Sequence, residues 1–157
     1  MLKNIETVLL PFFKSHNILK AIVFGSYARK TNTRKSDLET ARILLSNKRY
    51  AHSCFHAQQA GEKCVKALWY LADADPWGHS IRRLIEEIPD ADAERFKDLM
   101  KLSETGAKLD RFYIPTRYPN GLPELTPDEA YFEEDARGAL TLAQNLIACV
   151  EKIIGAV

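Results

Sequence analysis

The longest uninterrupted helical pattern in the sequence runs from Tyr50 to about Leu71, and it limits the fold more than any other feature. On a helical wheel with about 100° per residue, small and apolar side chains fill one arc that we expect to face a core: Cys54, Ala57, Gly61, Cys64, Val65, Leu68 and Leu71. A helix with such a stripe buries it against other elements. The segment therefore predicts a core built around one long helix.

Helical patterns continue from Ser36 to the end of the chain. Ser36 and Glu39 fit a capping box, Ser80 stands before another apolar repeat, and Thr126 with Pro127 resembles a further helix start. The predicted helices span residues 36–46, 50–71, 81–88, 92–112 and 127–154, with a weak point near Gly106. This pattern predicts a mostly α fold, an antiparallel bundle of about five helices over residues 36–157.

Residues 1–35 differ from the rest of the chain. Residues 2–16 have a helical rhythm, and "KAIVFG", Lys20 to Gly25, is the one convincing strand pattern in the sequence. Because one strand makes no sheet, we expect a short helix–strand appendage. The predicted domains are residues 1–35 and residues 36–157.

Charge and cysteine content exclude several classes of protein. The 157 residues carry a net charge of +1, so a general attraction to nucleic acid is absent and any such binding needs a local basic patch. Three cysteines without C-x-x-C spacing argue against a disulfide framework and a zinc site, and they fit a reducing cytoplasm. No run is long enough to cross a bilayer, so we expect a cytoplasmic protein without a membrane partner.

A polar stripe lies beside the apolar face of residues 50–71. His52, His56, Gln59 and Lys63 fall within an arc of roughly 60°. Two imidazoles, an amide and an ammonium form a plausible surface for an anion or a nucleotide. The alternatives are a solvated or dimer-facing stripe, or a metal held by His52 and His56. No third ligand has motif spacing, so we predict no metal site.

The segment "YIPTRYP" places Arg117 beside Tyr118 in a proline-rich loop. A guanidinium next to an aromatic ring suits contacts with phosphate and base. The alternative is that the loop merely packs over the end of the bundle. His79 and Arg111 are further candidates for the same role.

Residues 36–155 resemble the HEPN domain, an all-helical module of prokaryotic proteins, often encoded beside a minimal nucleotidyltransferase. The likeness rests on "CFHAQQAGEKCVKAL", "HSIRRLIEEIP" and "LDRFYIPTRYPNG". It implies dimerisation, nucleotide or RNA binding and partnership with a nucleotidyltransferase, often in toxin–antitoxin pairs. The recurring motif positions imply one shared nucleotide-binding site, formed by His56, Gln59, Lys63, His79, Arg117 and Tyr118.

Residues 18–39 resemble the opening of the minimal nucleotidyltransferase itself, in "AIVFGSYARKTNTRKSDLE". The matching positions are Gly25, Ser26, Asp37 and Glu39, although Lys30 replaces the usual Gly and the later strands are missing. Two carboxylates at i and i+2 converge on Mg²⁺ from a strand but diverge on a helix. Because Ser36 begins a helical pattern, we interpret the motif as vestigial; Mg²⁺ is a cofactor only if transferase chemistry survives.

Some HEPN proteins are ribonucleases with an Arg and a His separated by four to six residues. Arg49 and His56 fit that spacing, with the imidazole as acid or base and the guanidinium on the phosphate. The primary prediction is a nucleotide- or RNA-binding HEPN protein that pairs with a minimal nucleotidyltransferase. The alternatives are a ribonuclease toxin, a residual Mg²⁺-dependent transferase and a non-catalytic dimerisation module.

Overall fold

The computed structural model describes residues 28–72, 74–89 and 93–155. These residues contain α3 (Ala28–Ser46), α4 (Tyr50–Leu71), α5 (Ile81–Glu86), α6 (Ala93–Met100), α7 (Ser103–Asp110), the 3₁₀ helix η1 (Pro119–Gly121), α8 (Pro127–Ala130) and α9 (Glu133–Gly155). They contain no strand. The predicted helix 2–16, the predicted strand 20–25, and Ser26 lie outside the described residues.

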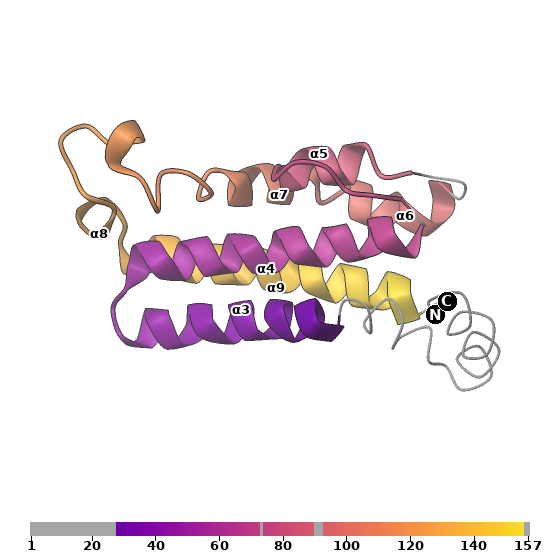
Figure 1. The fold of residues 1–157 in the computed structure, drawn as a ribbon, viewed down its shortest axis with the longest axis horizontal. Coiled ribbons are helices and arrows are strands. Elements are labelled where there is room, and N and C mark those ends of the chain that lie inside the picture. Colours follow the sequence, from indigo (N-terminus) through magenta and orange to yellow (C-terminus); the bar gives the residue numbers. More distant parts are fainter. Residues whose placement is uncertain (1–27, 73, 90–92, 156–157) are drawn as a thin grey trace, which may run out of the picture. The chain divides into compact units, whose positions relative to one another are not determined.

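The chain divides into two compact units, Met1–Thr33 and Arg34–Val157. The second unit is a helical bundle in which α3 and α4 run antiparallel and α9 lies along α4 in the same direction (Figure 1). The shorter helices α5, α6 and α7 belong to the connection between the end of α4 and the start of α9. The mostly helical bundle predicted for this part of the chain is thus confirmed, and the assignment of residues 1–35 to a domain of their own stays a prediction.

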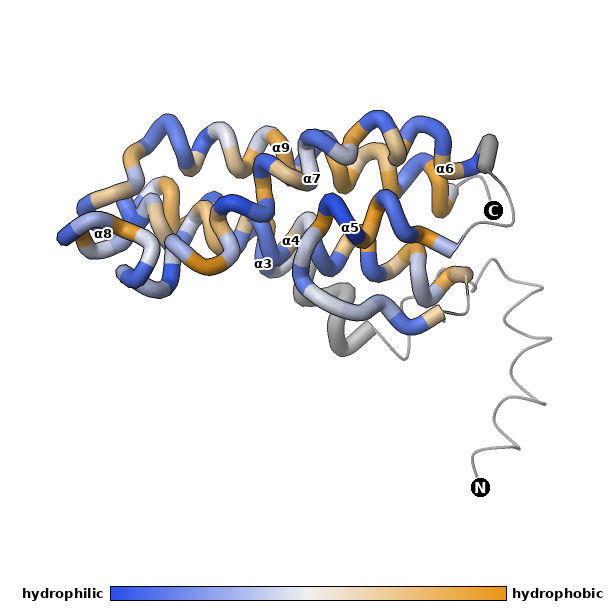
Figure 2. The backbone as a smooth tube through the Cα atoms, turned by 90° about the horizontal axis from the view of Figure 1, so that it is seen from above, coloured by the Kyte–Doolittle hydropathy of each residue, from blue (hydrophilic) through white to orange (hydrophobic). Residues whose placement is uncertain are grey.

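The core lies mainly between α4 and α9. Six of the seven α4 residues on the predicted apolar arc are buried, and Leu71 at the helix end is half-buried. Six apolar positions of α9 that recur at helical spacing are buried: Leu140, Ala143, Leu146, Ile147, Val150 and Ile154. Hydrophobic and hydrophilic residues alternate along the helices in Figure 2, as expected of helices with one buried face.

Three predicted boundaries were wrong. α3 begins at Ala28, so Ser36 and Asp37 lie inside the helix and the Ser36 capping box does not begin it. The predicted helix 92–112 is two helices, broken at residues 101–102 and not near Gly106. The predicted last helix is interrupted at Tyr131 and Phe132, so α8 is a single turn.

The contact between α7 and α5 fixes the segment before α5. The Asp110 carboxylate at the end of α7 accepts hydrogen bonds from the backbone N–H of Ile81 at 2.6 Å and the Ser80 hydroxyl at 2.7 Å. A Cβ on Gly106 would lie 2.9 Å from the backbone nitrogen of Arg82, so only glycine allows this approach. Ser80 caps α5 as predicted, by accepting from the N–H of Arg83. His79, a predicted site residue, is therefore anchored beside α7.

Candidate functional site

Helix α3 docks on α4 along one side of the polar stripe. The Ser53 hydroxyl donates to the carbonyl of Ala41 at 2.7 Å in a buried contact. One turn away along α3, the Asp37 carboxylate lies 3.2 Å from Nδ1 of His56 and 2.5 Å from Nζ of Lys63. The side chain of Asp37 is 12% exposed, those of His56 and Lys63 about a third. We call these three residues the Asp37 cluster.

Asp37 and Glu39 have the divergence expected of a helix. Asp37 faces α4, whereas Glu39 is exposed and pairs with Arg42 on its own helix. Both oxygens of Asp37 already have a partner from α4. This arrangement agrees with the helical interpretation of the sequence, in which the two carboxylates share no metal.

A second carboxylate lies further along α4. Glu62, 5% exposed, is 3.0 Å from Nδ1 of His79 and 2.9 Å from Nζ of Lys66. The buried amide of Gln58 donates to the same carboxylate at 3.1 Å, and the amide of Gln59 donates to Gln58 at 2.7 Å. We call these five residues the Glu62 cluster. A buried charge is tolerated when its oxygens are filled in this way.

Arg117 lies against three aromatic rings. Its guanidinium carbon is 4.5 Å from the ring centroid of Tyr113, 4.8 Å from that of Phe55 and 5.1 Å from that of Tyr118. Its Nε donates to the carbonyl of Tyr113 at 3.0 Å. Such cation–π contacts fix the guanidinium plane and leave its remaining N–H groups for a ligand. We call Arg117 with these rings the Arg117 box.

The Arg117 box connects the two clusters. The ring of His79 stacks on Tyr113 with centroids 4.7 Å apart, and the ring of His56 meets Phe55 edge-on at 5.4 Å. A series of contacts thus runs from Asp37 through Arg117 to Glu62. The structure therefore brings together all six residues predicted to bind a nucleotide, on the surface of α4 and the two segments beside it.

This arrangement suits an anionic ligand. An imidazole that is oriented through Nδ1 by a carboxylate presents Nε2 outward, and Nε2 donates to an anion when the ring is protonated. His56 and His79 each have such a carboxylate, and Arg117 lies between them in the series of contacts. Imidazole and guanidinium groups held in this way bind phosphate oxygens, and exposed rings such as Tyr118, 49% exposed, stack on bases.

Two other predicted residues, Arg49 and His52, share a different partner. Asp128 of α8 lies 3.1 Å from Arg49 and 3.6 Å from His52. Within the described residues, no hydrogen bond, ion pair or ring contact joins Arg49 to His56. No group of three possible metal ligands occurs in the described part of the chain, and His52 and His56 have separate carboxylate partners.

Sequence reasoning missed the residues that hold the site together. Gln58 falls about 20° from the edge of the apolar arc on the wheel of α4, so a polar residue near a core position was its signal. Glu62 falls midway between that arc and the polar stripe and had no such signal. The contact of Asp37 with α4 had no comparable signal, because it joins positions 19 and 26 residues apart. In the sequence, Phe55 and Tyr113 were recognised only as aromatic residues within "CFHAQQAGEKCVKAL" and "LDRFYIPTRYPNG".

Comparison with known proteins identifies relatives of this bundle. The family model of the HEPN domain matches residues 33–153. The putative toxin MJ1304 of Methanocaldococcus jannaschii is 32% identical over 126 residues, which cover 76% of this chain and 82% of that protein.

Solved structures agree with this likeness. TT1696 from Thermus thermophilus is 35% identical, with a TM-score of 0.69 over 78% of this chain and 93% of that one. ST0689, described as an archaeal HEPN homologue, is 31% identical with a TM-score of 0.62 over 78% and 93%. An HEPN domain protein from Thermotoga maritima is 28% identical with a TM-score of 0.61 over 80% and 97%.

In the described residues, no helix is long and apolar enough to span a membrane.

Proposed function

This chain belongs to the HEPN family, and we propose that it binds nucleotides or RNA through the surface formed by the Asp37 cluster, the Arg117 box and the Glu62 cluster. The phosphate is held by Arg117, His56 and Lys63, and the base stacks on Tyr118. Gln59 and His79 extend the surface along α4. No metal ion takes part in this binding.

One observation carries the proposal. Two histidines are fixed through Nδ1 by carboxylates, Asp37 for His56 and Glu62 for His79, and the series of contacts between them passes through Arg117. A merely solvated stripe needs no such fixation. Groups that are held in place before binding lose less entropy when a ligand arrives, and this supports a binding role.

The test compares two histidines of the same helix. Titration calorimetry with ATP, and fluorescence anisotropy with a labelled single-stranded RNA, are run on the wild type and on His56→Ala and His52→Ala. We expect His56→Ala to weaken binding by roughly tenfold, as the loss of one charge-assisted contact does. His52→Ala, which touches Asp128 outside the series of contacts, leaves affinity within about twofold. Equal affinities in all three proteins would sink the proposal.

We infer partners from the family. A homodimer and a minimal nucleotidyltransferase, as in toxin–antitoxin pairs, are the partners that the HEPN resemblance implies, and a relative named as a putative toxin supports the pairing. Sedimentation equilibrium at micromolar concentration tests the first partner, and a monomer there would count against it. Copurification with the product of a neighbouring transferase gene tests the second.

A ribonuclease is the second candidate function. The observation that favours it is the contact of His56 with Asp37, since an imidazole oriented by a carboxylate is suited to proton transfer. The predicted partner, Arg49, pairs with Asp128, so cleavage would require this pair to open. RNA degradation that survives both His56→Ala and Arg49→Ala would exclude this site. Activity that requires Asp37 and Mg²⁺ would instead favour a residual transferase.

A further inference from the structure

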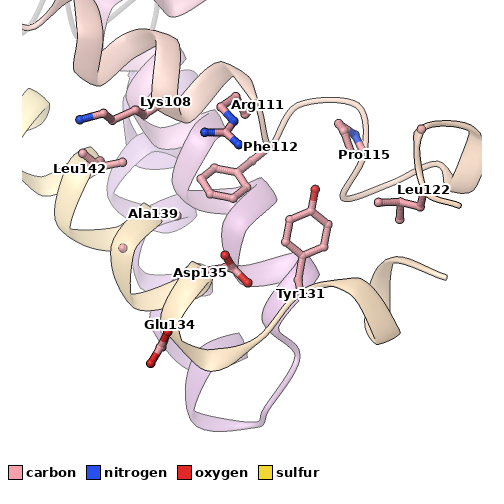
Figure 3. A pocket seen from close by; sticks show the side chains of 12 residues that line it. Lys108, Arg111, Phe112, Pro115, Leu122, Tyr131, Glu134, Asp135, Ala139 and Leu142 are labelled. Carbon is pink, nitrogen blue, oxygen red and sulfur yellow. The ribbon is translucent and has the colours of Figure 1, made fainter. Parts of the chain in front are cut away.

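A cavity of about 700 Å³ lies between the end of α7 and the start of α9. It is formed by the end of α7, the loop before η1 and the start of α9, and its lining includes Lys108, Arg111, Phe112, Leu122, Tyr131 and Asp135 (Figure 3). No lining residue belongs to the Asp37 cluster, the Glu62 cluster or the Arg117 box. The cavity is therefore a separate site, and its volume is in the range of small-molecule pockets.

The cavity brings together hydrogen-bond donors that lack a protein partner. Arg111 forms no ion pair and lies on no ring in the described part of the chain. By contrast, carboxylates or rings accompany the other arginines whose side chains are described: Arg42, Arg49, Arg82, Arg83, Arg95, Arg117 and Arg137. Neither the Lys108 ammonium nor the Tyr131 hydroxyl has a hydrogen bond to any described residue. Lys108 and Arg111 are exposed, so an anionic group that enters the cavity can replace water on three donors, two of them cationic.

Aromatic and apolar side chains form the remaining wall. The rings of Phe112 and Tyr131 meet edge to face with centroids 6.0 Å apart. Pro115 and Leu122 add apolar surface to the lining. In Figure 3, Arg111 and Phe112 extend from the end of α7 and Tyr131 from the segment before α9. Burial is the main cause that raises the pKa of Tyr131, so its hydroxyl stays protonated and able to donate. A planar ring fits such a wall.

Acidic residues limit the charge of the ligand. Asp135 and Glu134 of α9 also line the cavity, and together they balance the two cations. The Asp135 carboxylate already accepts from the backbone N–H of Phe132 at 2.9 Å. A ligand with several negative charges would be repelled by these carboxylates, whereas a single anionic group near Arg111 would not.

We propose that this cavity binds a planar aromatic monoanion, with its ring against Phe112 and Tyr131 and its anionic group on Arg111. The anionic group is a carboxylate or a singly charged phosphate or sulfonate, since all three accept from a guanidinium. Lys108 adds charge at the rim. This inference goes beyond nucleotide binding by the Arg117 box and shares no residue with it.

The probe is 8-anilinonaphthalene-1-sulfonate, a monoanion with a planar naphthalene ring, whose fluorescence rises in apolar surroundings. Its emission is titrated with the full chain, and bound probe is then displaced with benzoate, methyl phenyl phosphate, benzyl alcohol and inorganic phosphate. We expect displacement by benzoate or by methyl phenyl phosphate, a phosphodiester with one negative charge, since each has both a ring and a single charge. Benzyl alcohol and inorganic phosphate should displace the probe weakly. The stronger of the first two competitors identifies carboxylate or phosphate as the natural group.

Variants assign the binding to the cavity. Arg111→Gln is expected to weaken probe binding by at least about tenfold, and Tyr131→Phe by about threefold, as the loss of a charged and a neutral hydrogen bond does. The matched control is Arg137→Gln, an exposed arginine of α9 that pairs with Glu133 outside the cavity. Its affinity stays that of the wild type. Equal probe affinity for Arg111→Gln and Arg137→Gln, or displacement by benzyl alcohol as readily as by benzoate, would overturn the proposal.

Discussion

The Asp37 cluster and the Glu62 cluster contain the same three groups, a carboxylate, an imidazole and an ammonium, but they are assembled differently. Asp37 reaches α4 from another helix, so its contacts with His56 and Lys63 join α3 to α4. Glu62 belongs to α4, and Lys66 and Gln58 are one turn away on the same helix. Of these partners of Glu62, only His79 comes from outside α4.

The difference teaches which part of the site depends on tertiary structure. The Lys66 ammonium and the amides of Gln58 and Gln59 meet the Glu62 carboxylate wherever α4 is helical, because residues three or four apart lie on the same face of a helix. The Asp37 cluster exists only when α3 is docked. We therefore expect Glu62, Gln58 and Lys66 to keep their contacts independently of α3, and the His56 side of the surface to follow the position of α3.

The largest expected effect is that of Glu62→Ala. It leaves the buried Gln58 amide and the Lys66 ammonium without their carboxylate, so we expect a loss of about 3 kcal/mol in the free energy of unfolding. Urea unfolding followed by circular dichroism measures it. The control is Glu87→Ala, which removes an exposed pair with Arg83 and changes stability by less than about 0.5 kcal/mol. A Glu62→Ala protein as stable as this control would show that the cluster is not part of the core.

Asp37→Ala should destabilise less, by about 2 kcal/mol, because His56 and Lys63 regain water once their carboxylate is gone. Its distinguishing feature is local: amide hydrogen exchange should rise in residues 36–46 of α3, whereas α4 and α9 keep their protection. Glu39→Ala, two residues away on the exposed side of α3, is the matched control. Uniform loss of protection across all helices would contradict the separation of the two clusters.

Arg117→Lys tests the part that connects the clusters. Lysine keeps the charge but cannot present a planar guanidinium to the rings of Tyr113 and Phe55. We expect ATP affinity to fall roughly tenfold, by about 1.4 kcal/mol, with little change in unfolding. Calorimetry on the variant measures the first effect and urea unfolding the second. If ATP affinity does not change, Arg117 is a packing residue and the ligand lies elsewhere.

The free energy of unfolding should fall at alkaline pH in the wild type and equally in Glu62→Ala and Asp37→Ala. Burial, with a smaller contribution from Asp135, raises the pKa of the Cys54 thiol to about 12 from 9.0. A group with a raised pKa contributes stability that is present below its unfolded pKa and is lost as pH rises toward the folded one. Stability should thus fall by about 1 kcal/mol between pH 9 and pH 10. Urea midpoints at the two pH values measure the loss, and Cys54→Ala should reduce it while Glu62→Ala and Asp37→Ala keep it. Cys149, whose pKa burial also raises, accounts for the rest.

The sequence predicted the helices better than the contacts between them. The period of apolar residues was sufficient for α4 from Tyr50 to Leu71 and for the core face of α9. The capping-box signal failed at Ser36, because Ser36 and Glu39 lie inside α3. The structure places His56, Lys63 and Arg117, which family likeness grouped, in one series of contacts. Neither approach showed that Asp37, assigned to a metal motif, holds His56 and Lys63, because helix docking is not encoded in a local pattern.

The most direct test of the central claim is calorimetric titration of the wild-type protein with ATP, first with Mg²⁺ and then with EDTA. The account predicts binding that survives EDTA, with affinities within about twofold, because imidazole, ammonium and guanidinium groups need no metal to hold phosphate. Binding that disappears with EDTA would contradict it. That result would mean that Asp37 releases His56 and Lys63 and converges with Glu39 on a metal ion.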